Sequence, residues 1–208
     1  MPERPLDRRA VVIAGHAGDL AAVRSALGSS EPAVRASALG ALARLAALDV
    51  ADVVDALTDE SADVVRRAIG VAGRLHDRDP TVDALLVAML TGMNDTLAEA
   101  AAWALGERHE EDGTELVHHI VVALAAAVTG HHDALVREAA VAALGGIGSP
   151  DGRAAVLSAV TDKATVRRRA VLALAAFDGP EVDAALERAR GDRDWQVRQA
   201  AEDLAPHM

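Results

Sequence analysis

Histidines gather in one part of this sequence, and histidine is a residue type that binds metals and transfers protons. Carboxylates accompany them, so the segment contains His109, Glu110, Glu111, Asp112, His118, His119, His131, His132 and Asp133. Imidazole and carboxylate groups are apt ligands for zinc, iron or manganese. Adjacent side chains on a helix point about 100° apart, so only one histidine of each neighbouring pair can face a given site. We therefore expect a polar insertion with two turns, no metal and no other cofactor. A metal site within His109–His132 is the competing hypothesis.

Other catalytic chemistry has no support in the sequence. There is no cysteine, which excludes disulfides, thiolate zinc sites and cysteine nucleophiles. Nucleophile-base motifs, phosphate-binding glycine loops and dinucleotide fingerprints are also missing. The glycines Gly145, Gly146 and Gly148 follow an apolar helical stretch and are expected to cap that helix and form a turn. We predict that the protein is not an enzyme.

Composition restricts the class of partner. The 208 residues have a formal net charge of −11 and contain one lysine, Lys163, which argues against a phosphate backbone as the usual partner. The apolar run near the start is too short for a signal peptide, and no segment approaches the roughly 20 apolar residues of a membrane span. We expect a cytoplasmic protein that contacts no membrane and whose partner is another protein.

A short phrase, valine followed by arginine, recurs along the chain. Its arginines are Arg35, Arg66, Arg137, Arg167 and Arg198. The long interval in the middle contains one more copy, NDTLAEAAAWALGERH, in which Ala98 stands in the position of the arginine. A phrase repeated at a period near 31 residues indicates a stacked array of similar units.

Each copy has the spacing of a helix that buries one side. Leucine stands seven residues after the arginine position at Leu42, Leu105, Leu144 and Leu174. Proline follows a helix-capping residue or glycine at Pro80, Pro150 and Pro180, which indicates that another helix starts there. This is the first helix of the hairpin, and the helix with the arginine position is the second. The sequence therefore predicts helical hairpins that cover one another's apolar sides.

The stretch from Asp133 to Gly145, DALVREAAVAALG, resembles the HEAT repeat, and more closely the short HEAT-like repeats of the phycobilisome-lyase type. The resemblance implies an all-α, right-handed α-solenoid of about six hairpins with an N-terminal capping helix. We expect one domain over residues 1–208. Its expected parts are a cap at 1–17 and repeats near 18–47, 48–77, 78–109, 110–148, 149–178 and 179–208.

The same resemblance implies a structural role for the repeat arginine, which pairs with an acidic residue in a turn of the same or an adjacent repeat. The candidate acids are Asp133, Asp162 and Asp194, four or five residues before their arginines. An arginine fork matches the geometry of a carboxylate, so a ladder of such pairs would fix the register of the repeats. The competing hypothesis is a row of arginines that binds phosphates.

Two families of HEAT-type enzymes offer comparisons. Deoxyhypusine hydroxylase binds iron through His-Glu pairs just after the repeat arginine, and no such pair occupies the matching positions here, so that activity is not expected. Alkylpurine DNA glycosylases use a basic groove with aromatic residues, in which Trp103 could stack on a base. A DNA-repair protein of this type is the alternative function, although no catalytic acid can be matched.

The leading prediction is a non-enzymatic adaptor or scaffold that binds a helix or peptide on the face of the second helices. Trp103 is the expected anchor, because tryptophan beside arginine is typical of interaction hot spots; the alternative is that Trp103 fills a gap between repeats. For Trp195, which opens the last second helix, packing or capping is expected. The apolar walls and orienting charges of the predicted face are Val71, Leu172, Arg67, Arg74, Glu99, Glu138 and Arg168.

Overall fold

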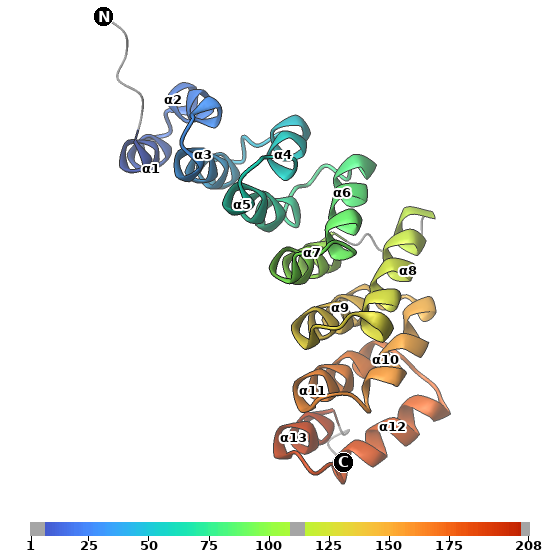
Figure 1. Cartoon of the computed structure of the whole chain (residues 1–208). Helices are drawn as coiled ribbons and strands as arrows, with labels where there is room; N and C mark the ends of the chain where they lie inside the picture. Colours follow the sequence, from blue (N-terminus) through green and yellow to red (C-terminus); the bar gives the residue numbers. More distant parts are fainter. Residues whose placement is uncertain (1–6, 109–114, 205–208) are drawn as a thin grey trace, which may run out of the picture. The chain divides into compact units, whose positions relative to one another are not determined.

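The computed structural model describes residues 7–108 and 115–204, and its regular elements are all helices (Figure 1). No strand occurs within these ranges, so the predicted all-α class is confirmed. None of the described helices is long and apolar enough to cross a bilayer. The chain divides into two compact units, Met1–Leu85 and Leu86–Met208, and the division falls within α6 (Pro80–Leu90). The single-domain assignment and the repeat boundaries stay predictions.

The first unit is built from two helical hairpins that follow a leading helix. Helices α1, α3 and α5 lie side by side in one layer, while α2 packs on α3 and α4 packs on α5. The leading helix contributes Val11 to a cluster that also contains Val23, Val34 and Leu42, so it covers the apolar side of the first hairpin. The elements are α1 (Arg8–Ala17), α2 (Leu20–Ser25), the 3₁₀ turn η1 (Ala26–Gly28), α3 (Pro32–Arg44), α4 (Val50–Leu57) and α5 (Ala62–Ala72).

The second unit repeats the same two-layer arrangement. One layer contains α7, α9, α11 and α13, and the other contains α8, α10 and α12. Short 3₁₀ turns, η2 (Pro150–Gly152) and η3 (Leu174–Ala176), precede α10 and follow α11. The helices are α7 (Asp95–Glu107), α8 (Glu115–Gly130), α9 (Ala134–Ile147), α10 (Arg153–Ala159), α11 (Ala164–Ala173), α12 (Pro180–Arg190) and α13 (Trp195–Asp203).

The periodic leucines form the core that the sequence pattern predicts. Leu42, Leu105, Leu144 and Leu174 are between 0% and 1% exposed. Leu42, Leu105 and Leu144 come from second helices, and Leu174 comes from η3 directly after α11. Alanine and valine make up most of the remaining buried residues. Complete burial of such a side chain stabilises the fold by about 1.5–3 kcal/mol.

Short polar residues cap the start of several helices, and glycine in the left-handed conformation ends α1 and α9. Asp133 and Asp194 accept hydrogen bonds from backbone N–H groups in the first turns of α9 and α13. Gly148 ends α9 in the left-handed conformation, with φ of 66°. The expectation that Gly145 and Gly146 also serve as cap or turn residues is wrong, since both lie inside α9.

Gly145 instead allows two helices to approach closely. A Cβ atom at this position would lie 2.6 Å from Cβ and 2.9 Å from Cα of Ala173 in α11. Gly106 of α7 faces Ala143 of α9 in the same way, with 2.8 Å from its hypothetical Cβ to both Cα and Cβ. Contacts this short leave no room for a methyl group. The layer of second helices therefore packs backbone against backbone at these two crossings.

Gly145→Ala and Gly146→Ala make a matched pair within α9. The Gly146 position has no atom within 4 Å of a new Cβ, so alanine should raise the free energy of unfolding by up to about 1 kcal/mol through helix propensity. The same substitution at Gly145 should lower it by about 1–3 kcal/mol, because α9 and α11 must move apart. Urea denaturation of both variants measures this difference. Equal effects would show that the crossing tolerates a side chain.

Candidate functional site

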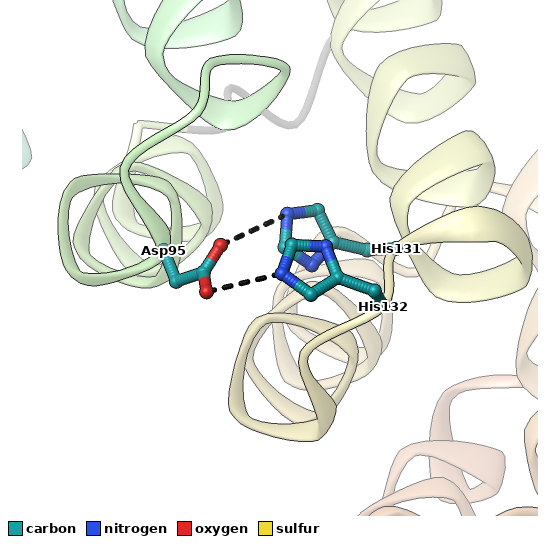
Figure 2. Close-up of side chains that lie close together, drawn as sticks. All are labelled: Asp95, His131 and His132. Carbon is teal, nitrogen blue, oxygen red and sulfur yellow. Dashed lines mark hydrogen bonds and ion pairs between the residues drawn. The ribbon is translucent and has the colours of Figure 1, made fainter.

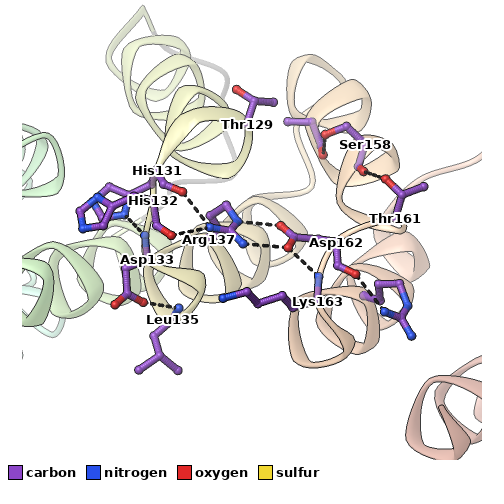
Figure 3. A network of polar contacts seen from close by, with 12 residues as sticks. Thr129, His131, His132, Asp133, Leu135, Arg137, Ser158, Thr161, Asp162 and Lys163 are labelled. Carbon is purple, nitrogen blue, oxygen red and sulfur yellow. Dashed lines mark hydrogen bonds and ion pairs between the residues drawn. The ribbon is translucent and has the colours of Figure 1, made fainter.

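The repeat arginines tie consecutive hairpins together. Nε and Nη2 of Arg137 in α9 donate to the two carboxylate oxygens of Asp162, in the turn before α11, at 2.6 and 2.7 Å (Figure 3). The third nitrogen, Nη1, donates to the carbonyl of His131 at 2.8 Å, in the turn before its own helix. One guanidinium group therefore forms hydrogen bonds both to the turn before its own helix and to the turn before the next second helix.

The same fork recurs at two further joints. Arg35 donates to both carboxylate oxygens of Asp59 at 2.8 and 2.7 Å, within the first unit. Arg167 donates to both oxygens of Asp192 at 2.9 and 2.7 Å, within the second unit. These arginine side chains are 6% to 13% exposed, and their forks are occupied by carboxylates. This geometry gives Arg35, Arg137 and Arg167 a structural role and leaves no fork for phosphate.

Several expected ladder residues lie elsewhere. Asp133 and Asp194 cap α9 and α13, because an acid four residues upstream falls at the N-cap position of the same helix. Arg66 is 61% exposed and lies 3.5 Å from Asp63 of its own helix, while Arg198 donates to the Asp192 carbonyl at 2.7 Å. The partners that sequence reasoning missed are Asp59 and Asp192. They follow their arginines by 24 and 25 residues, and that recurrence is the signal that could have found them.

The forked pairs shift the titration of both partners. The hydrogen bonds from Arg137 lower the pKa of Asp162 below its ordinary value, and Asp162 raises the pKa of Arg137. Arg167 lowers the pKa of Asp192, and Arg35 lowers that of Asp59, by the same cause. Partial burial acts in the opposite direction in each carboxylate, so the hydrogen bonds dominate.

In the repeat where Ala98 replaces the arginine, a different group of side chains connects α7 to the turn before α9. Asp95, the first residue of α7, faces both rings of the turn between α8 and α9 (Figure 2). Its Oδ2 lies 3.1 Å from Nε2 of His132, and its Oδ1 lies 4.0 Å from Nε2 of His131. The two imidazole rings stack with centroids 4.7 Å apart. In the forked pairs the arginine comes earlier in the sequence than its aspartate. Here the aspartate comes earlier than the histidines.

His131 occupies the position that an aspartate holds in other turns. Its Nδ1 accepts a hydrogen bond from the N–H of Asp133, two residues later, at 3.1 Å. The carboxylate of Asp192 accepts from the N–H of Asp194 in the same relation, at 2.8 Å. Ala98 cannot reach a partner in the next turn, and a histidine and an aspartate replace the usual pair. The substitution at Ala98 was the sequence signal for this exception.

The hydrogen bonds of this cluster oppose a metal site. The ligand atoms of Asp95, His131 and His132 lie within 4.8 Å of one another, as a metal site requires. Nδ1 of His131, however, already accepts a hydrogen bond from the N–H of Asp133. Nε2 of His132 lies within hydrogen-bond distance of Asp95, and a nitrogen that donates a proton to a carboxylate is not free to bind a metal. Of the other residues in the predicted segment, His118 contacts Asp151 at 3.0 Å, and His109, Glu110, Glu111 and Asp112 lie outside the described residues.

The predicted interaction residues of the first unit line a groove of about 1060 Å³. We call this the arginine groove, because Arg8, Arg44, Arg66, Arg67 and Arg74 line it. Arg67 and Arg74 are exposed, as the sequence pattern predicts for an orienting charge, whereas Val71 is only 8% exposed and lies beneath them. Sequence reasoning missed Arg44, because it compared the positions one, five and eight residues after the repeat arginine, and Arg44 stands nine residues after Arg35.

The predicted residues of the second unit centre on Trp103. This side chain is 41% exposed on α7, and Cζ of Arg169 from α11 lies 5.4 Å from the ring centroid. Glu138 of α9 lies 3.5 Å from Nη2 of Arg169, so three neighbouring second helices contribute to one cluster. The packing of cation against ring matches a cation–π contact. Arg169 was not predicted; sequence reasoning named its neighbour Arg168 instead.

The remaining residues of this face vary in exposure. Arg168 is exposed and Glu99 is half-buried one helical turn before Trp103. Leu172 packs partly buried against the cluster formed by α11 and α13, so it is a core contact as much as a wall. Trp195, for which packing or capping was expected, is 64% exposed.

Comparisons with known proteins agree with the fold. Residues 121–205 match the family model for HEAT repeats, which supports the HEAT-type interpretation; the closer relation to the phycobilisome-lyase type stays a prediction. No curated protein matches the chain in sequence. One engineered protein of known structure is 20% identical, with a TM-score of 0.63 over 89% of this chain and 96% of its own.

Designed armadillo repeat proteins are also similar in structure. One is 17% identical, with a TM-score of 0.61 over 89% of this chain and 98% of its own. Another, solved in complex with the peptide (KR)4, is 17% identical, with a TM-score of 0.56 over 96% of this chain and 98% of its own. At such identities the likeness concerns the fold alone. The chain is an α-solenoid repeat protein.

Asp162→Ala tests the forked pair. Removing this carboxylate leaves the largely buried guanidinium of Arg137 without its partner and should lower the free energy of unfolding by about 2–3 kcal/mol at neutral pH. Asp63→Ala breaks an exposed pair and should cost less than about 1 kcal/mol. Urea denaturation measures both.

The pH dependence of the Asp162→Ala effect follows from the lowered pKa. This contribution to stability is fully present above the unfolded-state pKa, about 3.9, and is lost as pH falls through the lower folded-state pKa. The difference between wild type and variant should therefore stay constant between about pH 7 and 5 and shrink below about pH 4. A difference that shrinks already above pH 5 would point to histidine.

Zinc provides the test of the Asp95, His131 and His132 cluster. We expect the unfolding temperature to be the same in excess Zn²⁺ and in a chelator, because hydrogen bonds occupy Nδ1 of His131 and Nε2 of His132. Differential scanning fluorimetry measures it, with His132→Gln as the control. An increase with Zn²⁺ that His132→Gln abolishes would establish a metal site and refute the hydrogen-bond assignment.

Proposed function

We propose that the chain is a non-enzymatic interaction module, an adaptor or scaffold of the cytoplasm that binds a helix or peptide of another protein. Binding uses the open side of its second helices. The observation that carries this proposal is the exposed Trp103 with Arg169 beside its ring. In a chain with three aromatic residues, an indole left 41% exposed on a packed helix layer is available for a partner.

The surroundings of Trp103 fit a binding hot spot. Tryptophan and arginine are the residue types that lose most binding energy on truncation, and here they lie together. Arg169 is already oriented by Glu138, which reduces the side-chain entropy lost when a partner binds. An apolar side chain of the partner would cover the indole, while the charges of Arg169 and Glu138 set its register.

The comparisons support an interaction role in general. One of the similar designed armadillo repeat proteins was solved with a bound peptide, so an α-solenoid of this size can hold a peptide. DNA repair finds less support. The chain has a net charge of −11, and the arginines Arg35, Arg137 and Arg167 are held by aspartates.

Site-specific photo-cross-linking around Trp103 tests the proposal. Glu99 and Glu107 lie one helical turn before and after Trp103, so a photoreactive phenylalanine analogue at either position should capture the same partner. Ala126 of α8 and Ala184 of α12, exposed on the other helix layer, are the control positions. Mass spectrometry identifies the captured protein.

Trp103→Ala should reduce the cross-linking yield by roughly tenfold or more, as expected for a hot-spot tryptophan. The variant should still fold, because the indole is largely outside the core. Equal capture from Ala126 or Ala184, or an unchanged yield in Trp103→Ala, would mean that the second-helix face is not the binding surface.

A further inference from the structure

Positive charge collects in the arginine groove although the whole chain is acidic. Arg8 comes from α1, Arg44 from the end of α3, and Arg66, Arg67 and Arg74 from α5 and the turn after it. The acidic residues in the same lining are Asp49, Asp63 and Asp77. The groove is thus locally cationic within a chain of net charge −11.

Three of these arginines have no carboxylate partner. Arg44, Arg67 and Arg74 form no ion pair with any residue in 7–108 or 115–204, whereas Arg66 has Asp63 at 3.5 Å. Arg44 and Arg67 also approach each other over Gly40. A Cβ on that glycine would lie 3.9 Å from Nη1 of Arg44 and 3.9 Å from Cζ of Arg67. Two guanidinium groups therefore lie on either side of one small residue.

Like charges held this closely repel each other, and an anion placed between them removes the repulsion. A guanidinium group has the planar fork that binds a carboxylate with two parallel hydrogen bonds. The ladder shows this chemistry within the same unit, where Arg35 holds Asp59. A carboxylate supplied from outside could complete the same pairing at Arg44, Arg67 or Arg74.

The dimensions and lining of the groove favour a peptide over a small molecule. Its volume of about 1060 Å³ is at the upper limit of sites for drug-sized ligands, which span about 300–1,000 Å³. Leu48, Val50, Val71 and Leu75 contribute apolar surface next to the arginines. A segment that alternates acidic and apolar side chains would match both features.

We propose that the arginine groove binds a carboxylate-rich segment of a partner protein. The inference rests on the proposed interaction function and assigns the chemistry of one binding surface. A long nucleic acid fits less well, because its phosphates would extend past the groove over a chain of net charge −11. The short acidic segment places its charge only where the arginines are.

The second unit shows why this chemistry belongs to the first. Eight residues after the arginine position of the repeat, where the first unit has Arg74, the second unit has Gly106 and Gly145. These glycines are in contact with Ala143 and Ala173 of the next helices. The same repeat position therefore serves helix packing in one unit and presents charge in the other.

Fluorescence anisotropy of labelled hexaglutamate with the full chain tests the inference. We compare Arg67→Gln/Arg74→Gln with Arg188→Gln/Arg193→Gln, two exposed arginines of the last hairpin, so that both variants lose the same charge. The groove variant should weaken binding by about tenfold or more, because two charge-assisted contacts are lost. The control should stay within about twofold. Hexalysine and hexathymidylate are the comparison probes.

Each result decides the matter. No hexaglutamate binding, equal weakening by both variants, or tighter binding of hexathymidylate would overturn the inference. Arg44→Gln is a second test, in which both the affinity for hexaglutamate and the unfolding temperature are measured. If Arg44 only interacts with the helix dipole of α3, the unfolding temperature changes and the affinity does not. If the cross-linking around Trp103 succeeds while hexaglutamate fails to bind, the proposed function stands and the groove assignment is wrong. If the cross-linking and the hexaglutamate binding both fail, the proposed function and the groove assignment are both wrong.

Discussion

The forked pairing of arginine with the aspartate of the next turn is the interaction on which the arrangement of the hairpins depends. Arg35, Arg137 and Arg167 each use two nitrogens for this carboxylate and a third for a carbonyl of a preceding turn. Apolar packing alone is not directional, and a layer of alanine and valine offers little to fix how one helix slides on another. A bidentate hydrogen bond between charged groups has one good geometry. It therefore sets the register that the close-packed second helices require.

Two kinds of exception to the forked pairing occur: a repeat without the arginine, and arginines at other positions. Where Ala98 replaces the arginine, Asp95 and the stacked His131 and His132 link the turns. Three arginines that do not occupy the repeat position make other contacts or remain exposed. Arg169 packs on Trp103, and Arg67 and Arg74 stay in solvent at the edge of a groove. Arg35, Arg137 and Arg167 thus have a structural role, and Arg67, Arg74 and Arg169 are the arginines on which the two proposals depend.

Small residues determine where such recognition is possible. Gly106 and Gly145 bring second helices of one unit into backbone contact, and a surface this closely packed offers little depth. In the first unit, Arg74 stands at the position that corresponds to Gly106 and Gly145, and it lines an open groove. Glycine at this repeat position allows close helix packing, whereas arginine presents charge. The protein has few aromatic residues, so the contact between the exposed indole of Trp103 and Arg169 is conspicuous.

The sequence by itself determined the helices, the repeat and the buried leucines. These depend on local spacing: Leu42, Leu105 and Leu144 recur at the same distance from the arginine position, and capping residues stand just before helix starts. Only the tertiary structure decided the partners of the polar side chains. Asp133 caps its own helix, while Arg137 reaches Asp162 in the next hairpin, because stacking brings residues 25 positions apart within hydrogen-bond distance. The placement of Arg169 on Trp103 and the opening around Arg44 likewise follow from how helices cross, which no local spacing encodes.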